Sequence, residues 1–224
     1  ENSILITFNN QNGSSLISLI TKAKNKIENA FTDSIIEIIQ SINSILVIYN
    51  TNEILEEDLK KILKNIESEK IEKKTLSKIW EIPICYDPIY AKDIEEFSIV
   101  KKIPLEKLIE IHKSKIYDVI SMGFLPGFMY LGYTDKILHC ERKKKPSLNV
   151  DKGSIGLALD QTCIYPQKSP GGWHIIGSSP ITFFKNNSQS PCFAKPGDKI
   201  SFFQITINEY ENIKNRKNFK PKFS

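Results

Sequence analysis

Residues 153–180 read GSIGLALDQTCIYPQKSPGGWHIIGSSP, a segment in which short apolar runs alternate with glycine, proline and polar residues. Short apolar runs bounded by such residues are typical of β-strands joined by tight turns. Similar runs lie outside it: YDVISMGF at 117–124, PITFF at 180–184 and DKISFFQITI at 198–207. Because closure removes the exposed edges of a sheet, many short strands of this kind predict a closed or nearly closed β-barrel.

Glycine and proline divide the chain into two halves. Gly13 is the only glycine before Gly123, and the other nine of the ten lie at 123–197. The first half can therefore form long elements, whereas the second half must turn often. We predict an α+β chain with a ferredoxin-like α/β domain at 1–83, a β-barrel domain at 84–210 and a basic, flexible C-terminal tail at 211–224.

The first half has the order strand, helix, strand, strand, helix, strand. The expected strands are ILITF, IIEIIQ, SILVIY and WEIPICY. Ser14 or Ser15 is expected to cap the first helix, and the second helix is expected to start near Thr51. This order matches a split βαβ unit of the ferredoxin-like type, and we expect it to act as a scaffold or interface.

Composition excludes several classes of protein. The 224 residues carry a formal net charge of +5, and the one dense basic patch, ERKKKP at 141–146, is short and lacks aromatic residues, so we expect no nucleic-acid partner. The sequence has no apolar run long enough for a membrane helix. Residues 1–8 lack the pattern of a secretory signal, so we expect a cytoplasmic protein. The four cysteines form no CxxC motif, which predicts reduced thiols and no metal site.

His112 lies in the second of two expected short helices, at 91–101 and 104–113. It lies seven residues after Leu105 and four after Leu108, on the apolar face of the second helix. A histidine so placed is either a hydrogen-bonded core residue or a catalytic group, and both interpretations stay open.

Four segments together resemble the family of 5-oxoprolinase B subunits, which is also described as allophanate hydrolase subunit 1 or KipI-like. They are GFLPGFMYLGYTD (123–135), GSIGLALDQTCIYP (153–166), SPGGWHIIGSSP (169–180) and KPGDKISFF (195–203). The resemblance implies an N-terminal α/β domain followed by a cyclophilin-like barrel. It also implies a complex with subunits A and C that opens 5-oxoproline to L-glutamate using ATP. Relatives occur in urea amidolyases, and one inhibits a sensor histidine kinase, which gives two alternative functions.

The resemblance directs attention to a set of candidate site residues. Backbone N–H groups of Gly171 and Gly172 can stabilise an oxyanion, and Gln161 and His174 can add side-chain hydrogen bonds. His112 is the third catalytic candidate, and Arg142 and Thr162 are assigned to substrate binding. The alternative for the PGGW segment is a tight turn whose Trp173 fills the barrel.

The sequence departs from the family pattern at several of these places. Leu159 and Asp160 stand where the family usually has two glycines, and Cys163 stands where it has another. Cys163 as a nucleophile therefore has no support from the resemblance. Of the arginines common before this segment, only Arg142 is present, with Ser147 and Asn149 at the later places.

The sequence also bears on cofactors and partners. It lacks GxxxxGK[ST], so we expect this chain to bind no cofactor and the complex to bind ATP through another subunit. Phe124, Phe128 and Tyr130 are expected to be exposed and to contact the C subunit, with the alternative that these rings fill the barrel core.

Overall fold

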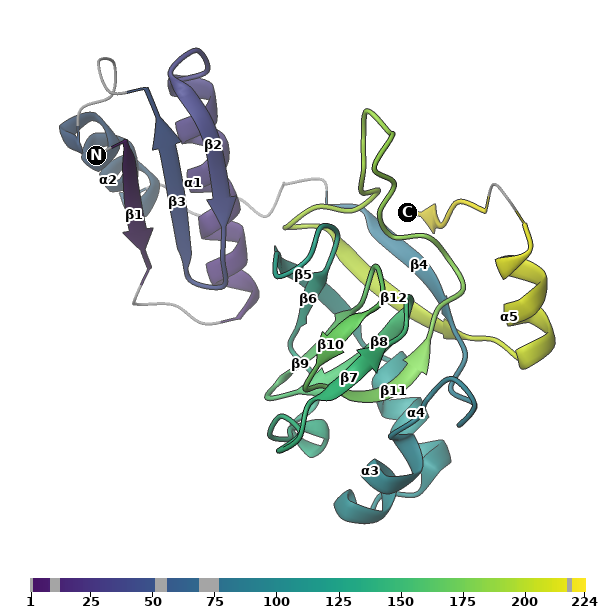
Figure 1. Ribbon diagram of the computed structural model, residues 1–224. Coiled ribbons are helices and arrows are strands. Elements are labelled where there is room, and N and C mark those ends of the chain that lie inside the picture. Colours follow the sequence, from purple (N-terminus) through teal and green to yellow (C-terminus); the bar gives the residue numbers. More distant parts are fainter. Residues whose placement is uncertain (1, 9–12, 51–55, 69–76, 217–218) are drawn as a thin grey trace. The chain divides into compact units, whose positions relative to one another are not determined.

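The computed structural model describes residues 2–8, 13–50, 56–68, 77–216 and 219–224. The chain is a mixed α+β protein with two compact units, Glu1–Leu76 and Ser77–Ser224 (Figure 1). Each unit has its own core of buried apolar side chains, so each is described by itself.

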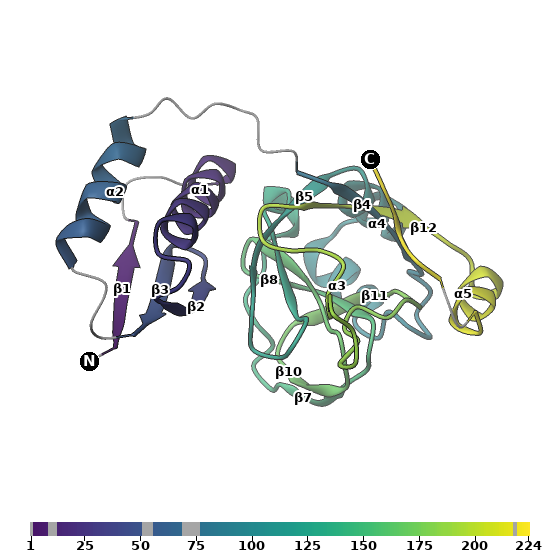
Figure 2. The same ribbon diagram turned by 90° about the horizontal axis from the view of Figure 1, so that it is seen from above.

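The first unit is a three-stranded antiparallel sheet with two helices on one face (Figure 2). Its elements are β1 (Ser3–Thr7), α1 (Ser14–Ala30), β2 (Ile35–Gln40), β3 (Ser44–Tyr49) and α2 (Glu56–Ser68). The strand order β1-β3-β2 places β3 between the two strands that α1 connects. Ile20, Ala23 and Ile27 of α1 are fully buried, as the helical spacing of its apolar residues predicts.

The predicted starts of the first two helices have different outcomes. Gly13 is the N-cap of α1, and within the described part of the chain no side chain makes a capping hydrogen bond there, so the prediction that Ser14 or Ser15 is the cap is wrong. Thr51, the expected start of the next helix, lies outside the described residues, and α2 is described from Glu56.

The four-stranded ferredoxin-like prediction is wrong in its last strand. β4 (Ile79–Ile84) pairs with β12 (Lys199–Gln204) and β13 (Lys222–Phe223), and so belongs to the second unit. The boundary consequently lies between residues 76 and 77 rather than after 83. A buried apolar strand has the same pattern in any sheet, so its partners cannot be identified from its own residues.

The second unit is built on an eight-stranded sheet in the order β11-β8-β9-β6-β5-β12-β4-β13. The strands not yet given are β5 (Ile116–Met122), β6 (Met129–Gly132), β8 (Ser154–Ala158), β9 (Gln161–Ile164) and β11 (His174–Ser178). Cys85, just after β4, exchanges two backbone hydrogen bonds with Ser178 of β11, at 2.8 and 3.0 Å. The sheet therefore curls round until β4 meets β11. The expected strand at 180–184 does not form.

Short elements complete this unit. A separate ribbon pairs β7 (Ser147–Val150) with β10 (Ser169–Gly171), and η1 (Lys136–Leu138) is a single 3₁₀ turn. The helices α3 (Ile94–Lys101) and α4 (Leu105–Lys113) lie where the sequence predicts them, and α5 (Ile207–Lys214) follows β12. Ile94 and Phe97 of α3 and Leu108 of α4 are buried in the core inside the sheet.

The KPGD segment at 195–198 connects two neighbouring strands of the sheet. The Asp198 carboxylate accepts hydrogen bonds from the Trp80 indole N–H (3.1 Å) and from the backbone N–H of Lys195 (3.1 Å). A buried carboxylate requires such donors. Asp198 thereby joins the turn before β12 to its neighbour β4.

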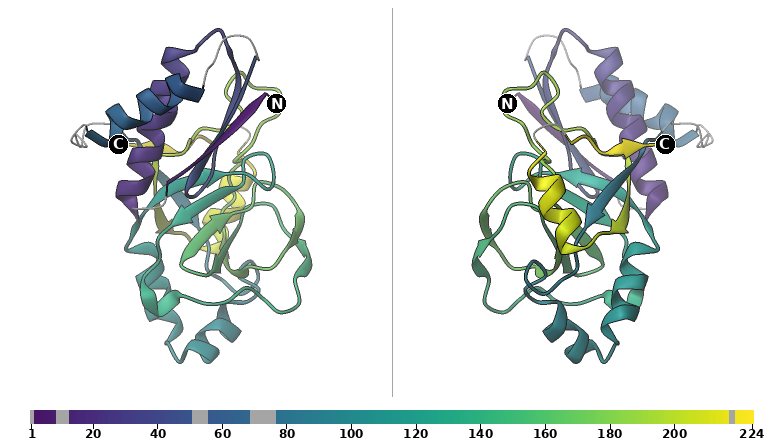
Figure 3. Two further views of the ribbon diagram at one scale, coloured as in Figure 1. Left: turned by 90° about the vertical axis from the view of Figure 1, so that its left-hand side faces the viewer. Right: turned by 90° about the vertical axis from the view of Figure 1, so that its right-hand side faces the viewer.

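The prediction of a flexible C-terminal tail is wrong for the described residues. Thr206 and Glu209 form a reciprocal capping box at the start of α5. Tyr210 stacks on Tyr90 with ring centroids 4.0 Å apart, and its hydroxyl lies 3.1 Å from Oγ of Ser178. Figure 3 shows α5 (yellow) beside the sheet, and β13 pairs with β4 beyond it. Aromatic contacts made across long sequence distances hold this segment.

Leu159 is expected to cost the second unit stability. It lies in the hairpin between β8 and β9 with φ 55°, a left-handed conformation that favours glycine, and its side chain is 53% exposed. Leu159→Gly should stabilise the unit by about 1 kcal/mol, since the strain of about 1–2 kcal/mol outweighs the packing that is lost. Thermal unfolding followed by tryptophan fluorescence measures this effect. Ala158→Gly, in the buried strand beside it, should destabilise instead, and equal effects of both substitutions would contradict the argument.

Candidate functional site

The candidate site lies on the outer face of β6, β9 and β8. Side chains alternate along β9, so Thr162 and Ile164 point into the core while Gln161 and Cys163 point outward. Ile164 packs in the main core, whereas Cys163 belongs to a second cluster. That second cluster is aromatic, and its buried members are Phe128, Val150, Ala158, Cys163, Tyr165, Trp173 and Ile175.

The Gly171-Gly172-Trp173 turn packs on this aromatic cluster. A side chain at Gly171 would overlap the hydroxyl of Tyr165, so only glycine fits there. Trp173 is 5% exposed, and its ring centroid lies 6.0 Å from that of Tyr130. It fills the cluster outside the sheet rather than the barrel interior. A Cβ built at Gly172 would by contrast make only ordinary contacts, at 3.9 Å, with Arg142, Lys143 and Pro146, so the basic loop lies against this residue.

Arg142 carries a positive charge near the outer face of β6, β9 and β8. Its side chain is exposed, yet its charge reaches the groups beneath it. Burial raises the pKa of Tyr130, and Arg142 opposes that rise. Burial likewise holds the pKa of Cys163 well above its usual value despite Arg142, so this thiol stays protonated and is a poor nucleophile. The structure therefore places Arg142 beside the Gly172 turn, with its charge acting on the Tyr130 phenol.

His112 and Thr162 lie on the opposite side of the sheet, inside the core. The Thr162 hydroxyl donates to the carbonyl of Gly156 (3.0 Å), so it must accept from Nε2–H of His112 (3.1 Å). Nδ1 of His112 then accepts from the Tyr86 hydroxyl (2.8 Å). Burial lowers the pKa of His112 to about 3. Both side chains are fully buried and the pair ties α4 to β9, which favours the core interpretation of His112, while the assignments of His112 to catalysis and Thr162 to substrate binding stay predictions.

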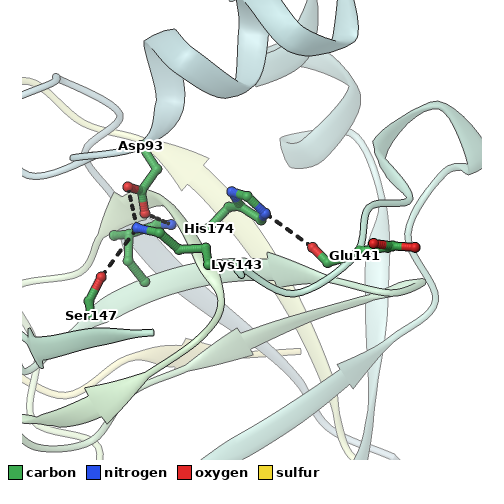
Figure 4. A network of polar contacts seen from close by, with 6 residues as sticks. Asp93, Glu141, Lys143, Ser147 and His174 are labelled. Atoms are coloured by element: carbon green, nitrogen blue, oxygen red, sulfur yellow. Dashed lines mark hydrogen bonds and ion pairs between the residues drawn. The ribbon is translucent and has the colours of Figure 1, made fainter. Parts of the chain in front are cut away.

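A polar network anchors the edge of the site (Figure 4). Nζ of Lys143 lies 2.6 Å from Oδ1 of Asp93 and donates to Oγ of Ser147 at 3.2 Å. His174, a predicted catalytic residue, donates from Nε2 to the carbonyl of Glu141 at 3.1 Å. The sequence did not identify Asp93 and Lys143 as a pair. The basic residues of ERKKKP look equivalent in sequence, and only the fold shows that Lys143 is partly buried.

The predicted interface aromatics separate into three environments. Phe124 is 62% exposed and has φ 69°, an unusual conformation for a bulky residue. Tyr130 is half-buried, and Phe128 is 1% exposed at the centre of the aromatic cluster. The prediction of exposure is therefore wrong for Phe128, because neighbouring rings surround it.

This arrangement can hold an anionic group on its rim. A guanidinium, a phenol and a glycine turn can all donate hydrogen bonds to a carboxylate or an oxyanion.

Among the described residues, no group of three or more His, Cys, Asp or Glu side chains could hold a metal ion. In the same part of the chain, no helix is both long and apolar enough to cross a membrane.

Comparison with protein families and curated sequences gives consistent relatives. Residues 1–194 match the family described as carboxyltransferase domain, subdomain C and D. The 5-oxoprolinase B subunit of Escherichia coli O157:H7 is 34% identical over 171 residues, which cover 75% of this chain and 78% of that protein. The corresponding B subunit of Bacillus subtilis is 36% identical over 63% of this chain, and the match spans 59% of that protein, less than two thirds of its length. A urea amidolyase of Saccharomyces cerevisiae is 22% identical over 88% of this chain and 12% of the enzyme.

Solved structures include similar folds. PH0987 from Pyrococcus horikoshii, described as a conserved uncharacterized protein, is 33% identical with a TM-score of 0.58, covering 94% of this chain and 97% of that chain. The urea carboxylase of Kluyveromyces lactis has a TM-score of 0.76 at 20% identity, covering 99% of this chain and 23% of that chain. The second likeness is one of fold alone.

The buried His112 is expected to make the second unit sensitive to acid. Its pKa lies near 3 in the folded state and near 6.5 when unfolded, so between these values only the unfolded chain binds the proton. The stability that neutral His112 provides is complete above pH 6.5 and is lost as the pH falls toward 3. His112→Phe keeps the stacking on Phe202 but removes this titration.

The measurement is urea unfolding at several pH values, followed by the fluorescence of Trp80 and Trp173, which both lie in the second unit. His112→Phe should be less stable at pH 7 by about 1–3 kcal/mol, because the Tyr86 hydroxyl loses its acceptor. Between pH 6 and 4 its stability should fall less steeply than that of the natural chain, by up to about 1.4 kcal/mol per pH unit. Parallel stability curves would contradict the assignment.

Proposed function

The chain belongs to the family of carboxyltransferase subdomains C and D that includes the 5-oxoprolinase B subunits, and from this membership we propose that it is the B subunit of an ATP-dependent 5-oxoprolinase. The observation that carries the proposal is that three curated relatives at 34–36% identity all bear this name. Together with subunits A and C, the chain opens 5-oxoproline to L-glutamate in the cytoplasm. The second unit is a cyclophilin-like barrel in this proposal.

The substrate has two features that the outer face can recognise. 5-Oxoproline carries a carboxylate, and the exposed Arg142 guanidinium beside the Tyr130 phenol is a suitable donor set for it. The lactam carbonyl gains negative charge when it is activated, and backbone N–H groups at the half-buried Gly172 turn can stabilise that charge. Gln161 points to the same face and can donate through its amide.

The chain acts only within a complex in this proposal. The lactam is a resonance-stabilised amide, and its carbonyl is activated by phosphate from ATP before water attacks. The sequence contains no GxxxxGK[ST] motif, so the nucleotide is held by another subunit. The exposed ring of Phe124, held in a strained conformation, is the proposed contact with the C subunit.

A second candidate function is a component of an enzyme that carboxylates urea. The observation that favours it is the similarity to urea amidolyases over 88% of this chain, at 22–24% identity. Urea carries no carboxylate, so this function gives Arg142 no substrate group to bind. The two candidates therefore differ in which compound stimulates ATP hydrolysis.

Reconstitution tests the proposed function. The chain, mixed with subunits A and C from the same organism, should co-elute with them in size-exclusion chromatography. The mixture should release glutamate from 5-oxoproline in proportion to the ATP hydrolysed, and the chain alone should do neither. Turnover of 5-oxoproline by the chain alone, or stimulation by urea instead of 5-oxoproline, would overturn the proposal.

Arg142→Ala tests the carboxylate site in the reconstituted complex. Loss of a charged hydrogen-bond donor, worth about 1.5–3 kcal/mol, should raise KM for 5-oxoproline by roughly 10- to 100-fold. The melting temperature should not change, because the Arg142 side chain is exposed. Lys144→Ala, which removes an exposed cation from the same loop, is the matched control and should leave KM unchanged. Equal KM values for both variants would remove Arg142 from the site.

A further inference from the structure

We propose that Asp93 and Lys143 are positioning residues that hold Arg142 against the outer face of the sheet. The inference deepens the proposed function and rests on the role given there to Arg142. Neither residue touches substrate in this proposal, and both act through the backbone of the loop that carries the arginine.

The loop is fastened on both sides of Arg142. On one side, the carbonyl of Glu141 accepts a hydrogen bond from His174 at 3.1 Å. On the other side, the backbone N–H of Lys143 donates to the carbonyl of Gly172 at 2.7 Å. Residues 141–146 form neither helix nor strand, so these bonds and the Lys143 side chain, with the backbone pairing of Cys140 and Leu159 just before them, place Arg142.

Asp93 connects this loop to β11. Its Oδ1 lies 2.6 Å from Nζ of Lys143, and its Oδ2 accepts a hydrogen bond from the backbone N–H of Ile175 at 2.7 Å. The backbone N–H of Asp93 in turn donates to the carbonyl of Ile175 at 2.9 Å. One carboxylate therefore fixes both the loop before β7 and the strand that follows the Gly172 turn (Figure 4).

Burial distinguishes this ion pair from a similar one nearby. The side chains of Lys143 and Asp93 are 22% and 13% exposed, whereas those of Lys92 and Asp151 are 57% and 56% exposed at the same 2.6 Å separation. Exposed pairs contribute little, while removing one partner of a desolvated pair leaves a charge without compensation. The Lys92–Asp151 pair is thus a matched control.

The same contacts argue against a Ser147–Lys143 hydrolytic dyad. A lysine that activates a serine must accept the hydroxyl proton, and so must be neutral. Nζ of Lys143 instead lies 2.6 Å from the Asp93 carboxylate and 3.2 Å from Oγ of Ser147, so the carboxylate engages the group that a dyad would need as its base. The network is suited to holding geometry rather than to transferring protons.

The first test uses the chain alone and needs no activity. The ¹³Cζ signal of Tyr130, labelled in tyrosine and assigned with Tyr130→Phe, is recorded at neutral pH, because Arg142 acts electrostatically on this phenol. Lys143→Met and Asp93→Asn should move the signal in the direction that Arg142→Ala moves it. Lys92→Met should leave it in place, and Lys143→Arg should restore it. An unchanged signal in both Lys143→Met and Asp93→Asn would overturn the proposal.

The second test uses the complex with subunits A and C. Lys143→Met should raise KM for 5-oxoproline about tenfold with kcat little changed, and should have no further effect when added to Arg142→Ala. Additive effects in this double-mutant cycle would overturn action through Arg142. If the Tyr130 signal moves as expected but the natural complex does not open 5-oxoproline, the positioning role stands and the proposed function fails. Asp93→Asn keeps an acceptor for Ile175, so it remains informative if Lys143→Met does not fold.

Discussion

The two backbone hydrogen bonds between Cys85 and Ser178 are the constraint on which the second unit depends. They join β4 to β11, which are separated by five strands in the sheet order. They give a partner to the edge of β11 that faces away from β8. Oγ of Ser178 also lies within hydrogen-bond distance of the Tyr210 hydroxyl, so α5 packs against the same junction of β4 and β11. Closure therefore joins the strand after the Gly172 turn both to β4 and to α5.

The two faces of β9 have different roles: the inner face belongs to the core, and the outer face belongs to the candidate site. The inner face carries Thr162, which with His112 and Tyr86 forms a hydrogen-bonded chain inside an apolar core. Such a chain is stable only when each polar group has a partner, and here the proton positions are settled by the Gly156 carbonyl. The outer face carries the buried Gln161 and also Cys163, which packs in the aromatic cluster near Arg142. Adjacent residues of one strand thus serve different purposes, because side chains alternate along it.

Burial also divides the basic loop. Lys143 is held by Asp93 and Ser147 in a partly desolvated position, while Arg142 and Lys144 are exposed. A run of cations that looks uniform in sequence therefore contains one residue that fixes the backbone and one that faces the aromatic cluster. The glycine turn and the arginine are held by a single network, so the geometry of the proposed anion site depends on both.

Local pattern was sufficient for much of this protein. Short apolar runs identified most strands, helical spacing identified α1 and α4, and the glycine-rich segments located the turns beside the site. Leu159, where related sequences are expected to have glycine, lies at the left-handed position that explains that preference. These features depend on residues close together in the chain, so their physical causes are visible in the sequence.

Tertiary structure alone decided the rest. β4 pairs with β12 in the register Ile79–Lys199, and no local feature could assign it to the second sheet rather than the first. Asp93 reaches Lys143 and Ile175, Tyr210 reaches Tyr90, and His112 reaches Thr162, all across long separations in sequence. Whether a polar residue is exposed, paired or buried depends on which distant segment packs against it, and that is settled only when the sheet closes.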